Sequence, residues 1–286
     1  MILLTGITGN NGGATATALL EKGAKIRALV RDLDKASAWA DKGVELFQGD
    51  LSDAASIKAA LEGVESAVLV LNNSKEQESL ELNFIAAAKD AGLPWIIKVS
   101  SPEAVRGTTS PLPLAHIAAE DAIMESGMNW TFVRPSFFMQ NFRGSIPKAK
   151  ETGVLAMPMG DSGTAALTDC ADAGAFIAHI LTDGNKEQHY GQVYDITGPD
   201  PVMTFAEIAQ QVGEALGTEV KYVAADPQKF QEIMRPFVSS DWHSDAVAHL
   251  FAEIADGTTP GIKTDTFEKI MGHPGRSFKE FVKECA

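Results

Sequence analysis

The chain has 286 residues, a length that suits one large domain or two small ones. Hydrophobic residues make up 45% and charged residues 22%, as in ordinary globular proteins, so a core can form without disulfide or metal staples. The 24 basic residues are outnumbered by 38 acidic ones. The net charge of −14 argues against nucleic acid and against an anionic membrane surface as partners.

The two cysteines, Cys170 and Cys285, are far apart and show no metal-binding or disulfide spacing. We interpret them as free thiols in a reducing compartment, and we expect no metal site. No apolar run reaches 18 residues, and the opening MILLTG lacks the basic segment of a signal peptide. These features predict a cytoplasmic protein without a membrane partner.

Short apolar runs alternate with helical patterns through the first 135 residues. The apolar runs, which we expect to form strands, are 2–5, 26–30, 44–47, 67–71, 95–99 and 130–133. The helical patterns are 14–22, 53–62, 78–91 and 114–125. This alternation predicts βαβ units, and therefore an α/β chain with a Rossmann-type doubly wound parallel sheet.

The rhythm loosens after residue 135. Residues 153–168 suggest short strands and loops, 169–181 and 204–216 suggest helices, and 192–196 suggests a further strand. Thr204 and Glu207 have the spacing of a capping box at the start of the second helix. We therefore expect a dinucleotide-binding domain over 1–155, to which 165–198 returns, and a smaller, mostly helical substrate domain over 156–286.

A glycine-rich turn with the spacing G-x-x-G-x-x-G joins the first strand to the first helix, at Gly6, Gly9 and Gly12. Glycines in this position permit a tight turn and let the backbone approach a pyrophosphate, while the helix N-terminus attracts its negative charge. The spacing differs from the common G-x-G-x-x-G, but its place between a strand and a helix predicts nucleotide binding.

The end of the second strand bears on the choice between NADPH and NADH. An acidic residue there binds the ribose 2′-hydroxyl, whereas arginine accommodates a 2′-phosphate. The sequence has Arg31, followed by Asp32 and Lys35. We favour Arg31 supported by Lys35 as a 2′-phosphate site, hence NADPH; Asp32 keeps NADH possible, and a solvated charge pair is the plainer interpretation.

The chain resembles the NmrA-like group of atypical short-chain dehydrogenases/reductases in four stretches: GITGNNGGATATALLEKGAKIRALVRDLDKA, GVELFQGDLSD, HIAAEDAIMESGMNWTFVRPSFFMQNF and YDITGPDPVMTFAEIAQQVGEALG. The likeness covers nearly the whole chain and is strongest over residues 2–142. The group includes quinone reductases, dye and azo reductases, and cofactor-sensing regulators. The motifs are specific for the family and not for one substrate.

The resemblance implies a role for residues at the end of each strand. The pyrophosphate loop would comprise Gly6, Thr8, Gly9, Asn10, Asn11 and Gly12. The adenosine side would comprise Arg31, Lys35, Asp50, Leu51, Leu71, Asn72 and Asn73. The nicotinamide side would comprise Ser100, Ser101, His116, Pro135, Phe137 and Phe138. All of them follow the rule that ligands bind at the carboxyl ends of parallel strands.

The chain departs from the usual catalyst of short-chain dehydrogenases, a Tyr-x-x-x-Lys pair in which lysine lowers the tyrosine pKa. Its three tyrosines, at 190, 194 and 222, lie late in the chain and none has a lysine four residues on. The corresponding helix carries His116 and Glu120 instead. We expect His116 to contact the nicotinamide ribose or to donate a proton; the alternative is an ordinary helix histidine paired with Glu120. His243 is a second candidate acid.

Apolar side chains suited to a flat substrate follow the sixth strand and recur in the C-terminal half. We predict a substrate pocket that includes Phe138, Met139, Trp242 and His243. The same apolar set also contains Phe142, Met157, Met159, Phe230, Met234 and Phe237. Core packing is the better explanation for each residue taken alone, and only the cluster after the sixth strand has positional support.

These observations lead to an NADPH-dependent oxidoreductase that passes hydride directly to a conjugated or aromatic acceptor, such as a quinone, enone or dye. Such acceptors need less proton assistance than a simple ketone, which fits the missing tyrosine. The alternative is an NAD(P)-sensing regulatory protein with little catalysis that acts through a protein partner. An isomerase or epimerase is a third option. Either a monomer or a homodimer is compatible with the sequence.

Overall fold

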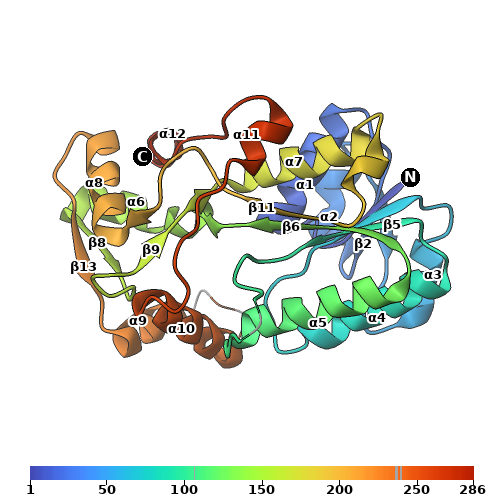
Figure 1. The fold of residues 1–286 in the computed structure, drawn as a ribbon, viewed down its shortest axis with the longest axis horizontal. Helices are drawn as coiled ribbons and strands as arrows, with labels where there is room; N and C mark the ends of the chain where they lie inside the picture. The colour runs from blue at the N-terminus through green and yellow to red at the C-terminus, as the bar shows by residue number, and fades with distance from the viewer. Residues whose placement is uncertain (106, 236–237, 239) are drawn as a thin grey trace. The chain divides into compact units, whose positions relative to one another are not determined.

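The computed structural model describes residues 1–105, 107–235, 238 and 240–286 (Figure 1). The chain forms two compact units. Unit 1 comprises Met1–Thr108, Pro113–Arg134 and Ala173–Tyr194, and unit 2 comprises Thr109–Leu112, Pro135–Asp172 and Asp195–Ala286. This division does not test the predicted domain boundary at residue 155 or the predicted return of residues 165–198 to the first domain, and both stay predictions.

Unit 1 is built on a seven-stranded sheet in the order β11-β6-β5-β4-β1-β2-β3. Its strands are β1 (Ile2–Leu4), β2 (Ile26–Val30), β3 (Glu45–Gln48), β4 (Ser66–Leu69), β5 (Trp95–Val99), β6 (Asn129–Pro135) and β11 (Gln192–Ile196). The pairs from β6 through to β3 are parallel. The six strands predicted for the first 135 residues and the doubly wound α/β fold are therefore confirmed.

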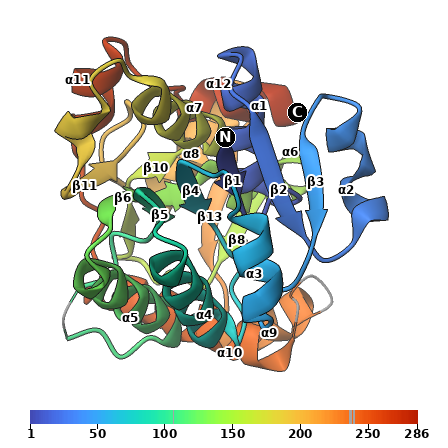
Figure 2. The same cartoon turned by 90° about the vertical axis from the view of Figure 1, so that its right-hand side faces the viewer.

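Helices cover both faces of this sheet. They are α1 (Asn10–Glu21), α2 (Leu33–Ala40), α3 (Ala54–Ala60), α4 (Gln77–Asp90), α5 (Pro111–Ser126), α7 (Cys170–Thr182) and the 3₁₀ turn η2 (Lys186–His189). Figures 1 and 2 show α3, α4 and α5 on one face and α1 with α7 on the other. On the first face, Phe84 and Ile123 pack against the inward side chains of Leu3 and Ile96, all nearly inaccessible. Burial on both faces explains why the central strands β1, β4 and β5 are mostly apolar, whereas the edge strands β3 and β11 carry exposed polar residues.

One helix of unit 1, α2, has no helical pattern in the sequence and was not predicted. Helix α2 begins after Asp32, whose carboxylate accepts hydrogen bonds from the backbone N–H groups of Asp34 and Lys35. Of its eight residues only Ala36 is buried, so the helix lacks the apolar periodicity on which prediction depends. An N-cap, rather than a hydrophobic face, marks its start.

Unit 2 consists of helices around three small two-stranded sheets. Its strands are β7 (Phe137–Phe138), β8 (Val154–Met157), β9 (Thr164–Ala165), β10 (Leu167–Thr168), β12 (Met203–Thr204) and β13 (Lys221–Ala224), paired as β10-β7, β12-β9 and β13-β8. Its helices are η1 (Met139–Phe142), α6 (Ser145–Thr152), α8 (Phe205–Leu216), α9 (Pro227–Met234), α10 (Asp241–Ala255), α11 (Thr266–Met271) and α12 (Phe278–Cys285). The smaller, mostly helical C-terminal part is confirmed.

The core of unit 2 is aromatic. Phe142, Phe205, Phe278 and Phe281 are almost completely inaccessible, and the ring of Phe142 packs edge-on against Phe278 with centroids 5.2 Å apart. The predicted capping box at the start of α8 is present: the Thr204 hydroxyl accepts a hydrogen bond from the Glu207 N–H, and the Glu207 carboxylate accepts one from the Thr204 N–H. This cap holds Phe205 and Ile208 of the helix in the core.

Candidate functional site

The turn after β1 is packed so tightly that glycine is required at two positions. Gly6 has φ +65°, a region that favours glycine, and a Cβ there would lie 2.6 Å from the carbonyl oxygen of Val70. A Cβ on Gly12 would lie only 2.2 Å from the carbonyl oxygen of Gly6. The first turn of α1 therefore presses directly on the loop that precedes it, and its backbone N–H groups stay open to a ligand.

The loops after β1 and β4 are joined by hydrogen bonds. The Thr5 hydroxyl donates to the carbonyl of Val70 at 2.7 Å and accepts from the Val70 N–H at 2.8 Å. On the same side, Asn72 Oδ1 lies 3.3 Å from the position that a Cβ of Gly9 would occupy. Two loops predicted to contact the cofactor are thus brought together.

The glycine turn fits a dinucleotide pyrophosphate. The first turn of α1 holds no acidic side chain, so nothing opposes an anion at this helix N-terminus. Asn11 Oδ1 is buried and has no hydrogen-bond partner within the described part of the chain. A buried acceptor without a partner costs free energy unless a donor reaches it, so this oxygen suits a hydroxyl or N–H group of a bound cofactor rather than the pyrophosphate itself. The roles of Thr8, Asn10 and the rest of the loop toward the pyrophosphate stay predictions.

At the end of β2, the positive charge of Arg31 is exposed, whereas the negative charge of Asp32 is engaged by neighbouring groups. Arg31 is exposed, and its guanidinium helps to lower the pKa of Asp50, after the dominant hydrogen bonds to that carboxylate from Ser52. Asp32, the residue that kept NADH possible, is engaged as the N-cap of α2 and also lies 3.6 Å from the Lys35 ammonium. A carboxylate with these partners is less available to a ribose hydroxyl than Arg31 is to a phosphate.

The remaining predicted residues of unit 1 lie at the ends of their strands. Leu51 and Leu71 pack partly buried against the core of unit 1. Asn73 is half-buried beside the exposed Asn72. Ser101 donates to Glu103 through its hydroxyl. The Ser100 hydroxyl is buried and has no partner among the described residues, which suits a bound ligand with a polar group.

His116 of α5 contacts a lysine that the sequence analysis did not single out. Lys98 lies in β5 with 0% of its surface exposed, and its ammonium is 3.0 Å from Nδ1 of His116. The same ammonium donates to Glu81 Oε1 at 2.9 Å and to the carbonyl of Val99 at 2.6 Å. The signal was present in the sequence, because Lys98 is the one charged residue in the buried run 95–99.

The environment of His116 keeps its imidazole neutral. Burial disfavours the charged form, and the Lys98 ammonium and the Arg134 guanidinium repel it, so the pKa of His116 is well below its usual range. His116 is not paired with Glu120, the alternative considered from the sequence. The Glu120 carboxylate instead accepts two hydrogen bonds from Arg134 of β6. At neutral pH His116 therefore lacks the imidazolium proton of an ordinary acid, although it keeps one N–H to donate.

The nicotinamide-side residues after β6 belong to unit 2. Pro135 is buried, and the half-buried Phe137 packs its ring against Phe142, Phe205 and Phe251. Phe138 is half-buried, whereas Met139 is fully enclosed in the core. Among these residues, Phe137 and Phe138 keep accessible surface for a ligand.

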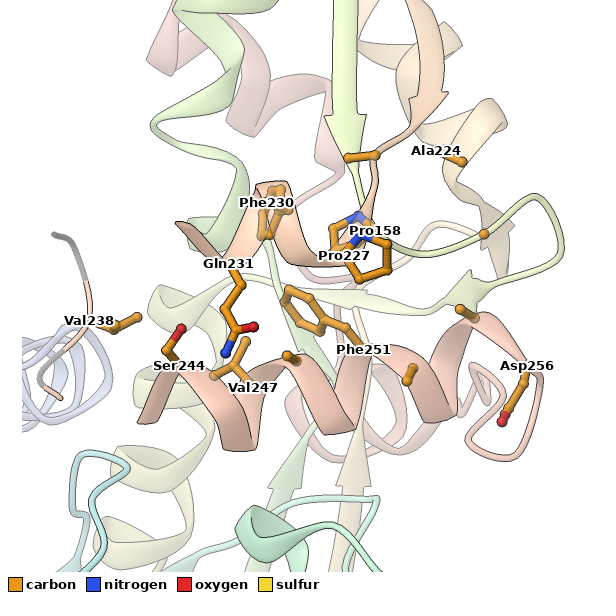
Figure 3. A pocket seen from close by; sticks show the side chains of 15 residues that line it. Pro158, Ala224, Pro227, Phe230, Gln231, Val238, Ser244, Val247, Phe251 and Asp256 are labelled. Carbon is orange, nitrogen blue, oxygen red and sulfur yellow. The ribbon is translucent and has the colours of Figure 1, made fainter. Parts of the chain in front are cut away.

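A cavity of about 460 Å³ lies within unit 2, between α9, α10 and the ends of β8 and β13. Figure 3 shows the rings of Phe230 and Phe251 directed into it, with Ser244 and Gln231 together at one end. The Ser244 residue is 4% exposed, and its hydroxyl has no hydrogen-bond partner in the described chain. Mostly apolar walls with a few polar groups are typical of small-molecule sites of this size.

The predicted pocket residues of α10 lie beside this cavity rather than around it. Trp242 and His243 are half-buried in the first turn of the helix, and neither is among the residues that line the cavity. The pKa of His243 is lowered by burial. Of the other apolar residues named from the sequence, Phe230 lines the cavity, Met157 and Met159 lie in the core, and Phe237 lies outside the described residues.

Among the described residues, no group of three or more histidine, cysteine, aspartate or glutamate side chains is arranged to hold a metal ion. Cys170 and Cys285 are both free, and burial raises the pKa of the Cys170 thiol to about 12. No helix in the part of the chain that the structure describes is long and apolar enough to span a membrane.

Comparison with known proteins places the chain in a family. The profile of the NmrA-like family matches residues 1–268, and the chain belongs to that family. It is 33% identical over 288 residues to an NAD(P)H azoreductase of Xenophilus azovorans, covering 100% of this chain and 98% of that protein.

Two solved structures extend the comparison. An NADPH-dependent quinone oxidoreductase from Escherichia coli complexed with NADPH matches with a TM-score of 0.87 and 29% identity, covering 99% of both chains. The triphenylmethane reductase of Citrobacter sp. complexed with NADP(H) matches with a TM-score of 0.87 and 26% identity, covering 100% of both chains. The family resemblance inferred from the sequence is confirmed.

Proposed function

We propose that this protein is an NADPH-dependent reductase of small quinone, azo or other dye acceptors. The observation that carries the proposal is the glycine turn, with its unpartnered Asn11 amide oxygen, in a chain whose relatives are an azoreductase, a quinone oxidoreductase and a dye reductase. NADPH, when bound, supplies the hydride. The protein contributes binding, orientation and exclusion of water.

Each part of unit 1 has a task in this proposal. The loop from Gly6 to Gly12 holds the pyrophosphate, and Arg31 meets the 2′-phosphate. The Ser100 hydroxyl and His116 meet the nicotinamide ribose at the ends of β5 and α5. Because His116 is neutral, it acts as a hydrogen-bond donor, and the proton that completes the reduction comes from solvent.

We propose that the cavity of unit 2 takes the acceptor. Its apolar walls suit a flat ring, and the unpartnered Ser244 hydroxyl can donate to a ring carbonyl or another acceptor atom. Phe230 and Phe251, whose ring centroids are 6.2 Å apart, can contact an inserted aromatic ring. Val247 lines the same wall from α10.

The test is turnover with a panel of acceptors. NADPH oxidation, followed by its absorbance, is measured with naphthoquinones, azo dyes and triphenylmethane dyes. We expect turnover with at least one class, and NADPH binding without turnover on any acceptor would favour the cofactor-sensing alternative. Val247→Trp fills the cavity and should raise the acceptor KM while leaving the NADPH KM unchanged. Val193→Trp, at an exposed strand position, is the matched control.

A further inference from the structure

The Lys98 ammonium has three hydrogen atoms and three acceptors around it. These are Glu81 Oε1 at 2.9 Å, the carbonyl of Val99 at 2.6 Å and Nδ1 of His116 at 3.0 Å. An ammonium group donates in three directions and accepts in none. Each hydrogen is therefore matched, and Nδ1 of His116 has to present a lone pair.

Lys98 and Glu81 form a buried ion pair, with Nζ 2.9 Å from Oε1 and both side chains inaccessible. Burial raises the pKa of Glu81, and the Lys98 ammonium opposes that rise. Glu81 is itself held by the side-chain amide of the buried Gln77, which donates to Oε1 at 3.3 Å. The pair is thus an ion pair in the interior of unit 1, with its cation turned toward His116.

The charges that face His116 come from each neighbouring element. Lys98 faces it from β5 and Arg134 from β6, while Glu81 of α4 is paired with the Lys98 ammonium. Glu120, on the helix of His116 itself, is neutralised by its two bonds with Arg134. The near charges are positive, and the negative ones are screened by the cations they pair with.

We propose that Lys98 is a positioning residue that fixes His116 as the neutral Nε2–H tautomer, with Nε2 directed away from the ion pair. His116 then offers one hydrogen-bond donor in a fixed orientation and does not act as an imidazolium acid. A lysine inside a strand supplies the cation of the site, in place of the lysine of a Tyr-x-x-x-Lys helix motif. The catalytic consequence rests on the proposed function; the tautomer does not.

The test is nitrogen-15 NMR of the histidine rings in the full chain without cofactor, with His116 assigned through His116→Gln. We expect wild-type His116 to show a protonated Nε2, an unprotonated Nδ1 and no titration between about pH 5 and 8. Lys98→Met removes the donor that fixes Nδ1, so the single ring proton should distribute over Nδ1 and Nε2, while burial and Arg134 still keep the imidazole neutral. Lys89→Met, at an exposed position of α4, is the control and should match the wild type.

Loss of Lys98 leaves Glu81 buried and unpaired, so the single variant risks unfolding. The double variant Glu81→Gln with Lys98→Met removes both charges and should give the same distribution of the ring proton over both nitrogens in a folded protein. A protonated Nδ1 in the wild type, or an unchanged His116 spectrum in the variants, overturns the proposal. Failure of the acceptor panel would overturn the proposed function alone, because the NMR measurement requires no turnover.

Discussion

Replacing Gly12 by alanine tests whether the packed turn builds the cofactor site. The new methyl group would lie 2.2 Å from the carbonyl oxygen and 2.6 Å from the carbonyl carbon of Gly6, and 3.0 Å from the Ile7 nitrogen. All three are backbone atoms, so no side chain can rotate away. Either α1 or the loop has to shift by about 1 Å to restore ordinary contact distances.

Overpacking of this kind costs about 1–3 kcal/mol. For a chain of this size, that cost lowers Tm by about 2–4 °C for each kcal/mol. The shift also withdraws the N-terminus of α1 from the pyrophosphate, and each 1.4 kcal/mol of lost binding free energy weakens affinity about tenfold. We therefore expect Gly12→Ala to reduce NADPH affinity at least tenfold and to lower Tm by several degrees.

The assays are calorimetric titration with NADPH and thermal unfolding followed by circular dichroism. Gly144→Ala is the matched control, since a Cβ there meets no atom within 4 Å and its φ of −75° suits alanine. We expect this control to bind NADPH as the wild type does. A Gly12→Ala protein with unchanged affinity and unchanged Tm would refute the packing argument for the turn.

Four further outcomes are expected. Arg31→Ala should raise the KM for NADPH about tenfold and leave the KM for NADH nearly unchanged. Because Arg31 is exposed, this magnitude is at the lower end of what a hydrogen bond to a charged group contributes. Equal effects on both cofactors would exclude a role for Arg31 in binding the 2′-phosphate. Since the pKa of His116 is lowered in the folded state, the unfolded chain binds more protons below about pH 6.5, so stability falls on acidification by up to about 1.4 kcal/mol per pH unit, and urea titrations should show a smaller loss in His116→Gln. Because the pKa of Cys170 is raised to about 12, a thiol reagent at neutral pH should label Cys285 in the native protein and both thiols only in denaturant. Thr204→Ala should destabilise the protein by about 1 kcal/mol through loss of its capping box, measured by chemical denaturation, with no change in NADPH affinity.

The features that could be predicted from the amino-acid sequence are those encoded by short-range pattern. The strands, most helices of unit 1 and the glycine turn are encoded by neighbouring residues, through periodicity, caps and the conformational freedom of Gly6. The glycine turn and Arg31 indicated a dinucleotide cofactor, and the resemblance to a family, carried by motifs in the same stretches, added the kinds of acceptor. Helix α2 escaped because its face is almost wholly exposed, so only a cap marks it.

Tertiary structure decided which side chains meet. Lys98 and His116 are 18 residues apart, and parallel pairing of the strands with α5 packed on them brings Nζ to Nδ1. The same packing pairs the Glu120 carboxylate with Arg134 and not with His116. The cavity is formed where α9, α10 and β13 pack near one another. Ser244 lines it, whereas its neighbours Trp242 and His243 do not. A sequence pattern specifies the face of a helix, but the identity of the residue opposite that face follows only from packing between distant segments.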